Sequence, residues 1–267
     1  MNVLVCMKQI LDPDIPAREF RIDPGAREAV RGSADLVANI FCENALETAL
    51  QLRAAAGGQV AVLTYGTDDA EDVLRKALAM KADAAALVEK EDASHPDALA
   101  VAKVLAAAAR RLADETWGAP ADLVMVGRES GDWGVGQTGG LLAEELGLPF
   151  VALVDHVESR EGGVRLRRQT DSGFEILEVD GPAVVSITNS DSNLPRIPKT
   201  RDVMRSYKKP LERWPLADLG LDGEDVRGGT SYYELVELEI PEQTISCEIV
   251  EDVDTFAERV ASIMNGA

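Results

Sequence analysis

Short apolar runs alternate with longer helical stretches along the chain, and this alternation constrains the fold more than any other feature. Strand-like runs occupy residues 2–6, 59–65, 83–89 and 121–127. Apolar residues at helical spacing occupy residues 42–55, 68–80, 95–112 and 137–146. Because helices that join successive strands form right-handed parallel units, the pattern predicts a doubly wound α/β domain with a mainly parallel sheet.

The pattern changes after a fifth strand-like run at 150–154. Residues 164–170 and 173–179 predict an antiparallel hairpin added to the sheet, and 182–188 predict a further buried strand. A stretch rich in Pro, Lys and Arg at 193–215 breaks the alternation, and the chain from there to residue 250 looks irregular. A closing helix is predicted over 252–264. We therefore expect an α/β domain over 1–192 and a C-terminal arm over 193–267 that packs across its own domain or a partner.

Charge and the first residues exclude several classes of protein. Acidic residues outnumber basic ones 47 to 27, for a net charge of −20, which disfavours binding to nucleic acid or to anionic lipid. The apolar start of the chain is too short for a signal segment or a membrane span, so we expect a cytoplasmic protein that is not membrane-embedded. Its three cysteines and two histidines are scattered, which argues against a disulfide framework or a zinc site.

The loop GRESGDWGVGQTGG (127–140) follows a predicted strand and opens a predicted helix. It contains GxGxxG at Gly134, Gly136 and Gly139, and Asp155 follows where a ribose-binding acid is expected in an NAD enzyme. However, seven residues separate the strand from the first glycine, and the motif follows the fourth strand rather than the first. No Lys-Ser/Thr pair closes a P-loop either. The loop therefore indicates a phosphate at a helix start, or no ligand at all.

No constellation of residues predicts acid–base or nucleophilic catalysis. The chain has no Gly-x-Ser-x-Gly elbow, and no Ser-His-Asp pattern is evident. We therefore expect a protein that binds a cofactor or a partner without catalytic residues of its own. A stand-alone oxidoreductase and a stand-alone adenine-nucleotide-binding module remain alternatives.

Six segments in chain order resemble the β subunit of electron transfer flavoproteins. They are VLVCMKQILD (3–12), ANIFCENALETALQL (38–52), VLRKALAMKADAAALV (73–88), VGRESGDWGVGQTGG (126–140), NLPRIPKTRDVMRSYKKP (193–210) and LADLGLD (216–222). The resemblance implies a heterodimer in which this subunit binds AMP in a structural role, while the redox-active FAD sits mainly in the α subunit. It also implies electron transfer from dehydrogenases, acyl-CoA dehydrogenases among them, to a quinone reductase, as in fatty acid oxidation.

The resemblance assigns site residues by position. It places AMP at Cys6, Asn39, Ile40, Phe41, Cys42, Tyr65, Asp132, Gly134, Val135, Gly136, Gln137, Thr138, Gly139, Gly140 and Leu141. It places the docking of partner proteins at Arg196, Lys199, Thr200, Arg201, Val203, Met204 and Arg205. The residues from Asp132 to Leu141 are expected to hold the phosphate.

The chain departs from the family pattern at several of these positions. Ile40 stands where proline is usual, Gly136 where AMP-binding members often have asparagine, and Lys81 replaces a glycine. An electron-bifurcating branch of the family binds a second FAD in place of AMP, and that alternative stays open. In the docking segment Thr200 occupies the position of the usual apolar anchor, which argues for another donor or for docking through charge.

Overall fold

The computed structural model describes residues 1–90, 97–223, 226, 235–241, 247 and 249–265. Residue contacts divide the chain into two compact units. The larger unit contains Met1–Phe20 and Arg31–Glu234, and the smaller contains Arg21–Val30 and Leu235–Ala267. The predicted boundary at residue 192, between an α/β domain and a C-terminal arm, stays a prediction.

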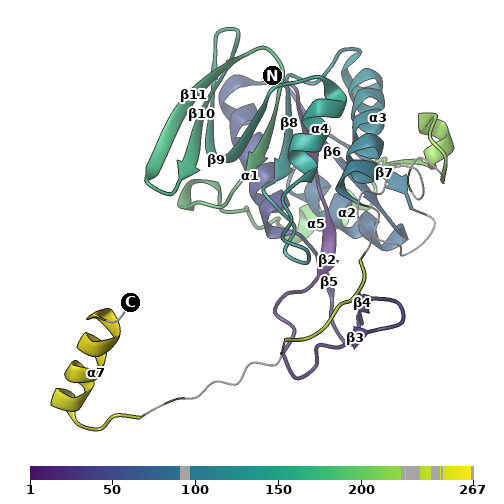
Figure 1. Ribbon diagram of the computed structural model, residues 1–267. Coiled ribbons are helices and arrows are strands. Elements are labelled where there is room, and N and C mark those ends of the chain that lie inside the picture. Colours follow the sequence, from purple (N-terminus) through teal and green to yellow (C-terminus); the bar gives the residue numbers. More distant parts are fainter. Residues whose placement is uncertain (91–96, 224–225, 227–234, 242–246, 248, 266–267) are drawn as a thin grey trace. The chain divides into compact units, whose positions relative to one another are not determined.

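One nine-stranded sheet forms the centre of the larger unit (Figure 1). Neighbouring strands pair in parallel in the order β9 (Phe150–Arg160), β12 (Ala183–Ile187), β8 (Leu123–Gly127), β1 (Val3–Cys6), β6 (Val60–Gly66), β7 (Ala84–Glu89) and β13 (Glu212–Trp214). An antiparallel hairpin, β10 (Gly163–Thr170) and β11 (Gly173–Asp180), extends the sheet beyond β9. The predicted fold class, a mainly parallel sheet with a hairpin addition, is therefore confirmed.

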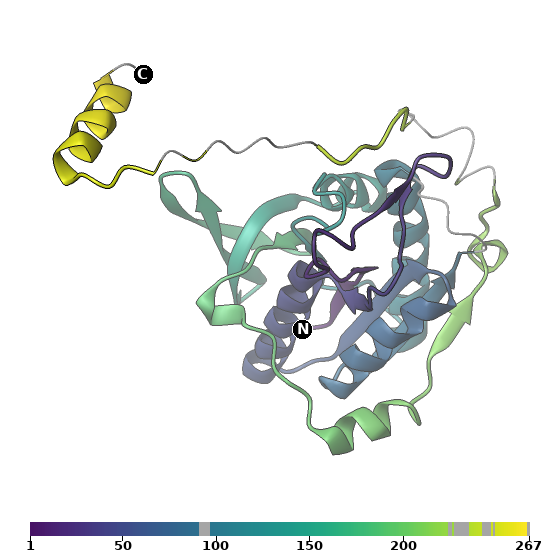
Figure 2. The same ribbon diagram turned by 90° about the horizontal axis from the view of Figure 1, so that it is seen from below.

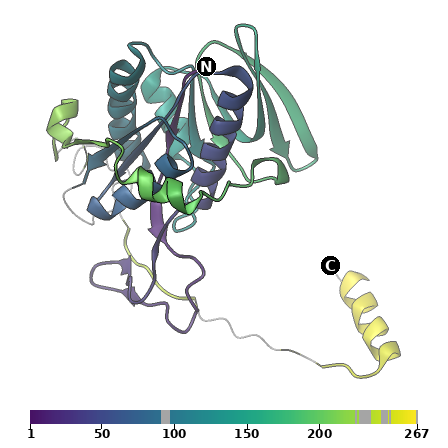
Figure 3. The same ribbon diagram turned by 180° about the vertical axis from the view of Figure 1, so that it is seen from behind.

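Helices cover both faces of this sheet, as the opposite views in Figures 1 and 3 show. One face packs on α1 (Ile40–Ala56) and α2 (Glu71–Ala79), and the other on α3 (Ala98–Trp117) and α4 (Thr138–Leu146). Alternate residues of β1 contribute to the two cores: Val3 and Val5 to the first, Leu4 to the second, each fully buried. A strand buried on both faces must be apolar throughout, which explains the continuous apolar runs of the sequence.

Two elements for which the sequence predicted no structure lie within residues 193–215, the stretch that breaks the alternation. Helix α5 (Thr200–Ser206) lies against α2 (Figure 3), and β13 adds a parallel edge strand to β7. Short 3-10 turns, η1 (Asp68–Ala70), η2 (Asp191–Asn193) and η3 (Leu216–Leu219), link elements of this unit. The predicted start of the third helix, residues 95–96, lies outside the described residues. Within the described residues, α3 begins at Ala98.

After β1 the chain leaves the sheet and returns at α1 (Figure 2). The ends of this excursion pair as β2 (Gln9–Leu11) and β5 (Leu36–Ala38). In the smaller unit β3 (Ile22–Asp23) pairs with β4 (Glu28–Ala29), and α7 (Val253–Asn265) confirms the predicted closing helix. No helix among the described residues has both the length and the apolar character needed to cross a membrane.

The strand order places a topological switch point at β1. From β1 the chain runs to β6 and β7 on one side, and it then returns to β8 on the other side of β1. The loops that leave β1 and β8 at their carboxyl ends therefore diverge to opposite faces. In open α/β sheets ligands bind at this point, which directs attention to the loop after β8.

Candidate functional site

Asn39 joins the loop after β8 to the start of α1. Its side chain is 1% exposed, and its amide donates to the carbonyl oxygen of Glu129 at 2.8 Å. Its Oδ1 atom accepts the backbone N–H of Gly131 at 3.1 Å. An amide can hold a carbonyl and an N–H at the same time, so this one side chain fixes two points of the loop.

Asn39 is also the N-cap residue of α1, but its side chain makes no capping hydrogen bond. Instead the amide contacts Cys42 Sγ at 3.3 Å and extends to the loop. The N–H groups in the first turn of α1 thus receive no bond from this side chain, although an asparagine at this position usually supplies one. The side chain of this N-cap residue therefore forms hydrogen bonds with the neighbouring loop rather than with its own helix.

Both carboxylates of the loop are paired with cations. The two oxygens of Asp132 each lie 2.8 Å from Lys8 Nζ, just beyond the end of β1. Glu129 pairs with Arg128, whose guanidinium also stacks 4.4 Å from the ring centre of Phe41 at the start of α1. These pairs offset the negative charges of Asp132 and Glu129. The two carboxylates therefore repel an anion beside the loop less than unpaired carboxylates would.

The glycines of the loop have separate geometric roles. Gly136 has a φ of +65°, a left-handed conformation that costs a residue with a Cβ atom about 1 kcal/mol or more. A Cβ atom on Gly139 would lie 2.9 Å from Val126 Cγ2 and 3.0 Å from Phe150 Cε2. Gly139 therefore allows α4 to pack closely on β8 and β9.

Helix α4 begins at Thr138 with Gln137 as its N-cap residue, and Leu141 N–H donates the first helical bond, to Gln137 O at 3.2 Å. The earlier N–H groups of the first turn have no carbonyl partner within the helix, and they carry the positive end of the helix dipole. A cavity of about 570 Å³ opens beside this turn. It is lined by Asp97, Ala98, Leu99, Gly136, Gln137, Gly140, Leu141 and Phe150.

The other predicted site residues meet at the same carboxyl edge of the sheet. Cys6 ends β1, and Tyr65 lies one residue before the end of β6. Cys6 and Cys42 are each 5% exposed, and burial raises the pKa of both thiols. Neither cysteine is therefore a nucleophile at neutral pH. Ile40 and Val135 are about half exposed, at 49% and 50%.

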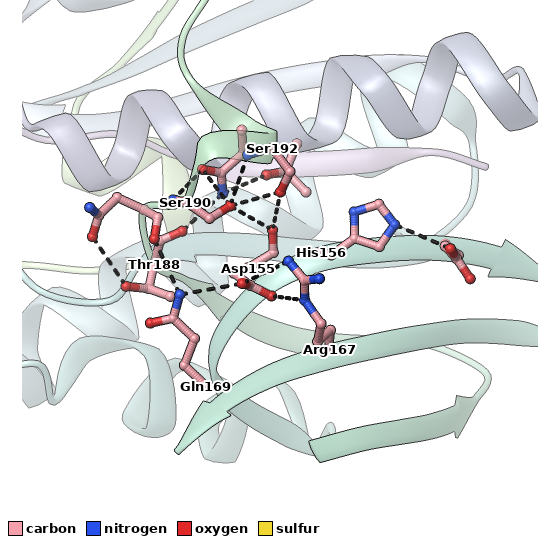
Figure 4. Close-up of polar contacts among 11 residues, drawn as sticks. Asp155, His156, Arg167, Gln169, Thr188, Ser190 and Ser192 are labelled. Atoms are coloured by element: carbon pink, nitrogen blue, oxygen red, sulfur yellow. Dashed lines mark hydrogen bonds and ion pairs between the residues drawn. The ribbon is translucent and has the colours of Figure 1, made fainter. Parts of the chain in front are cut away.

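Asp155, the acid that an NAD enzyme would need for ribose, is buried in an ion pair (Figure 4). It is 1% exposed and accepts from Arg167 Nε at 2.8 Å and Nη2 at 3.0 Å. Gln169 Nε2 donates to it at 3.3 Å, and the hydroxyl groups of Ser190 and Ser192 bond to its backbone oxygen. Its carboxylate already has its partners, which argues against the NAD hypothesis.

The predicted docking residues form a second cluster, which contacts α1 and α2 rather than the glycine loop. Arg196 forms a bidentate pair with Glu47 of α1, with N–O distances of 2.7 and 2.9 Å. Thr200 begins α5, and Lys199 and Arg201 beside it are exposed. Val203, Met204 and Arg205 are exposed on α5 as well.

Lys8 and Lys81 were not predicted as functional residues. The sequence held one signal for each: Lys8 is the first polar residue after β1, and Lys81 occupies a family glycine. Lys81 has a φ of +92°, which explains why glycine is usual at that position.

Comparison with known proteins agrees with this geometry. A family model for the electron transfer flavoprotein domain matches residues 29–219. Electron transfer flavoprotein subunit beta of Thermoanaerobacterium thermosaccharolyticum is 32% identical over 268 residues, which cover 98% of each chain. The chain belongs to the β-subunit family of electron transfer flavoproteins.

Two further members of the family have more specific names. Protein FixA of Azorhizobium caulinodans is 32% identical over 225 residues, which cover 83% of this chain and 78% of the relative. Subunit CarD of the caffeyl-CoA reductase–Etf complex of Acetobacterium woodii is 31% identical over 225 residues, which cover 84% and 82%. The resemblance predicted from six segments is thus confirmed.

Proposed function

We propose that this chain is the β subunit of a heterodimeric electron carrier and that it binds AMP in a structural role at the loop after β8. The observation that carries the proposal is the double hydrogen bond from Asn39 to Glu129 and Gly131, which holds the loop in place beside the ends of β1 and β6. The first turn of α4 offers N–H donors to a phosphate, with Thr138 adding a hydroxyl group.

The cofactor chemistry belongs to a second subunit in this proposal. FAD, when bound mainly by the α subunit, supplies the electron transfer, and this chain contributes binding surface and orientation. The thiols of Cys6 and Cys42 are buried and protonated, which agrees with a subunit that has no catalytic cysteine. Donor dehydrogenases, acyl-CoA dehydrogenases among them, deliver electrons to the complex, and a quinone reductase accepts them.

A second FAD in place of AMP is the alternative, and one observation favours it. The cavity of about 570 Å³ extends from Gly136 and Gln137 to the start of α3, and Cys6, Asn39 and Tyr65 do not line it. FAD is a dinucleotide, so its site must hold a flavin half as well as an adenosine half, one on each side of the pyrophosphate. This cavity provides space for the additional half next to the loop. AMP needs only the first part of the site.

The nucleotide content of the complex tests the proposal. The chain is co-expressed with an electron transfer flavoprotein α subunit, purified and denatured, and the released nucleotides are identified by chromatography. One AMP and one FAD per heterodimer support the carrier with a structural nucleotide. Two FAD and no AMP support the alternative, whereas a chain that purifies alone without any nucleotide refutes both.

A further inference from the structure

Lys8 links the start of α1 to the glycine loop. Its backbone oxygen accepts the N–H of Asn39 at 2.9 Å, so its main chain is tied to the residue before α1. Its Nζ atom lies 2.8 Å from each carboxylate oxygen of Asp132, in the loop after β8. The side chain of Lys8 therefore extends from a fixed point of the domain to one residue of the loop.

The loop is held on both sides of the segment 132–135. Before the segment, Asn39 accepts the backbone N–H of Gly131 at 3.1 Å. After it, Gly136 lies so close to Arg128 that a Cβ atom on the glycine would come within 3.1 Å of the Arg128 carbonyl oxygen. Residues 131–137 are all exposed. The segment 132–135 thus projects into solvent between two fixed ends.

The backbone of this segment has the features of a short lid. Gly134 and Gly136 have left-handed φ angles of +62° and +65°. Glycine adopts left-handed and right-handed conformations at similar cost, so the chain can change direction at these two residues. Hinges of active-site lids are a few loop residues that absorb such changes. The segment leads directly into α4 (Figure 1), so its position affects access to the first turn of that helix.

The ion pair between Lys8 and Asp132 has the strength of a contact that opens and closes. The two side chains are 43% and 26% exposed, so water and salt reach the pair. Asp132 Oδ1 also accepts the backbone N–H of Trp133 at 3.0 Å, which orients the carboxylate. A pair with this exposure shifts the ratio of closed to open states by about two- to fivefold. It is therefore strong enough to favour the closed segment and weak enough to release it.

We propose that Lys8 and Asp132 form a charge latch that holds the segment 132–135 closed beside the first turn of α4, and that the bound nucleotide leaves when this latch opens. Lys8 is then a positioning residue, because it acts on the nucleotide through the loop. The inference rests on the proposed function, which supplies the nucleotide. It adds a residue, Lys8, that controls how fast the nucleotide exchanges.

Neutralisation of charge is the competing explanation for the pair. In that case Lys8 only cancels the charge of Asp132, which otherwise repels the phosphate. A double variant separates the two explanations. If the pair is a latch, Lys8→Met, Asp132→Asn and the double variant break the same contact, so their effects do not add. If the pair only cancels charge, the double variant has no unpaired carboxylate and returns to the wild-type rate.

The test measures the release of radiolabelled AMP from the purified αβ complex. The complex is loaded with the label by exchange, unlabelled AMP is added in excess, and the label that remains bound is followed over time by gel filtration. Lys8→Met, Asp132→Asn and the double variant are each expected to raise the release rate by about three- to fivefold. Lys208→Met removes one positive charge from an exposed position after α5, so it is the matched control and should keep the wild-type rate.

Two further measurements distinguish a charge latch from a loss of packing. Release from the wild-type complex should become about twofold faster between about 0.1 M and 1 M NaCl, because the Debye length falls from about 10 Å to about 3 Å. Lys8→Met has no pair to screen, so its release rate should depend less on salt. Lys8→Arg keeps the charge and should release AMP more slowly than Lys8→Met, at close to the wild-type rate.

The outcomes separate the latch from the proposed function. If Lys8→Met releases AMP at the wild-type rate, the latch is overturned, while a wild-type complex that retains AMP leaves the proposed function standing. A wild-type rate in the double variant alone shows neutralisation of charge and refutes the latch. Equal salt dependence in wild type and Lys8→Met, or release from Lys8→Arg as fast as from Lys8→Met, refutes it as well. A wild-type complex that binds no AMP refutes the AMP role in the proposed function, and the inference with it.

Discussion

Replacement of Asn39 tests how the loop after β8 is held. Asn39→Ala leaves the carbonyl group of Glu129 and the N–H of Gly131 without the partner that they have in the native chain. A buried polar group that loses its partner costs about 1–3 kcal/mol, and the lower end applies because these two groups are only partly buried. We therefore expect Asn39→Ala to lower the free energy of unfolding by about 2 kcal/mol.

Two assays measure this loss. A decrease of about 2 kcal/mol corresponds to a fall in melting temperature of about 4–8 °C for a domain of this size, followed by circular dichroism. The nucleotide released on denaturation should fall with it, because the loop that is expected to hold the phosphate is no longer fixed. Asn189→Ala, which removes an exposed amide after β12, is the control and should stay within about 0.5 kcal/mol of wild type.

Asn39→Asp adds a pH dependence whose sign follows from the structure. The aspartate keeps the acceptor for Gly131 N–H but brings a carboxylate to the carbonyl oxygen of Glu129, to which the amide donates at 2.8 Å. Burial and that carbonyl group raise the pKa of the new carboxyl group. The loss of stability is then largest at high pH and shrinks as pH falls and the group becomes protonated. A wild-type melting temperature in Asn39→Ala, or an Asn39→Asp defect that grows on acidification, would refute the reasoning.

Three further predictions address separate features. Thr138→Glu should remove the bound nucleotide by charge repulsion and weaken assembly with the α subunit, whereas Thr138→Ser should retain both; unchanged nucleotide content in Thr138→Glu contradicts the phosphate assignment. A thiol reagent should titrate one cysteine in the native chain, the exposed Cys247, and three after denaturation, because the other two are buried and burial raises their pKa; a second fast-reacting thiol would show an open site. Burial raises the pKa of Glu47, but hydrogen bonds from Arg196 outweigh it and keep the pKa below its usual value near 4.5. The pair therefore stabilises the fold above about pH 4.5, and this contribution is lost as pH falls; the melting temperatures of wild type and Arg196→Ala should converge in acid, and a constant gap would contradict the pairing.

The parallel sheet could be predicted from the sequence because burial on both faces leaves a direct mark on composition. Every residue of β1 is buried, and Leu123–Val126 of β8 are at most 5% exposed, so each strand reads as an unbroken apolar run. The hairpin was predictable for a different reason, because it combines short strands with a turn at Asp171–Gly173. These signals are local, and a single sequence contains them in full.

Helix α5 and strand β13 could not be predicted by the same means. Helix α5 faces the protein with Asp202 and Ser206, so its apolar period points outward and gives no sign of a core-facing helix. Strand β13 has three residues, and Trp214 is the one that is buried, beneath the guanidinium of Arg111 at 4.6 Å. Both elements are defined by contacts with distant parts of the chain rather than by their own pattern.

The candidate site shows the same limit, since its deciding contacts are not local. Asn39 and Glu129 are 90 residues apart, and Lys8 and Asp132 are 124 apart. The sequence supplied the residue types through resemblance, but the pairing of these groups follows from the strand order. Because β8 lies next to β1, the loop after β8 reaches Lys8 and the start of α1.

Helix α1 connects this site to the predicted docking residues. At its start Asn39 holds the glycine loop, and eight residues later Glu47 holds Arg196, which leads into α5. Eight residues of helix span about 12 Å, so both contacts lie on one continuous stretch of the helix. In the proposed function, a nucleotide that stabilises the loop also stabilises the helix that anchors the docking segment. This is a physical reason for an electron carrier to bind a nucleotide that takes no part in electron transfer.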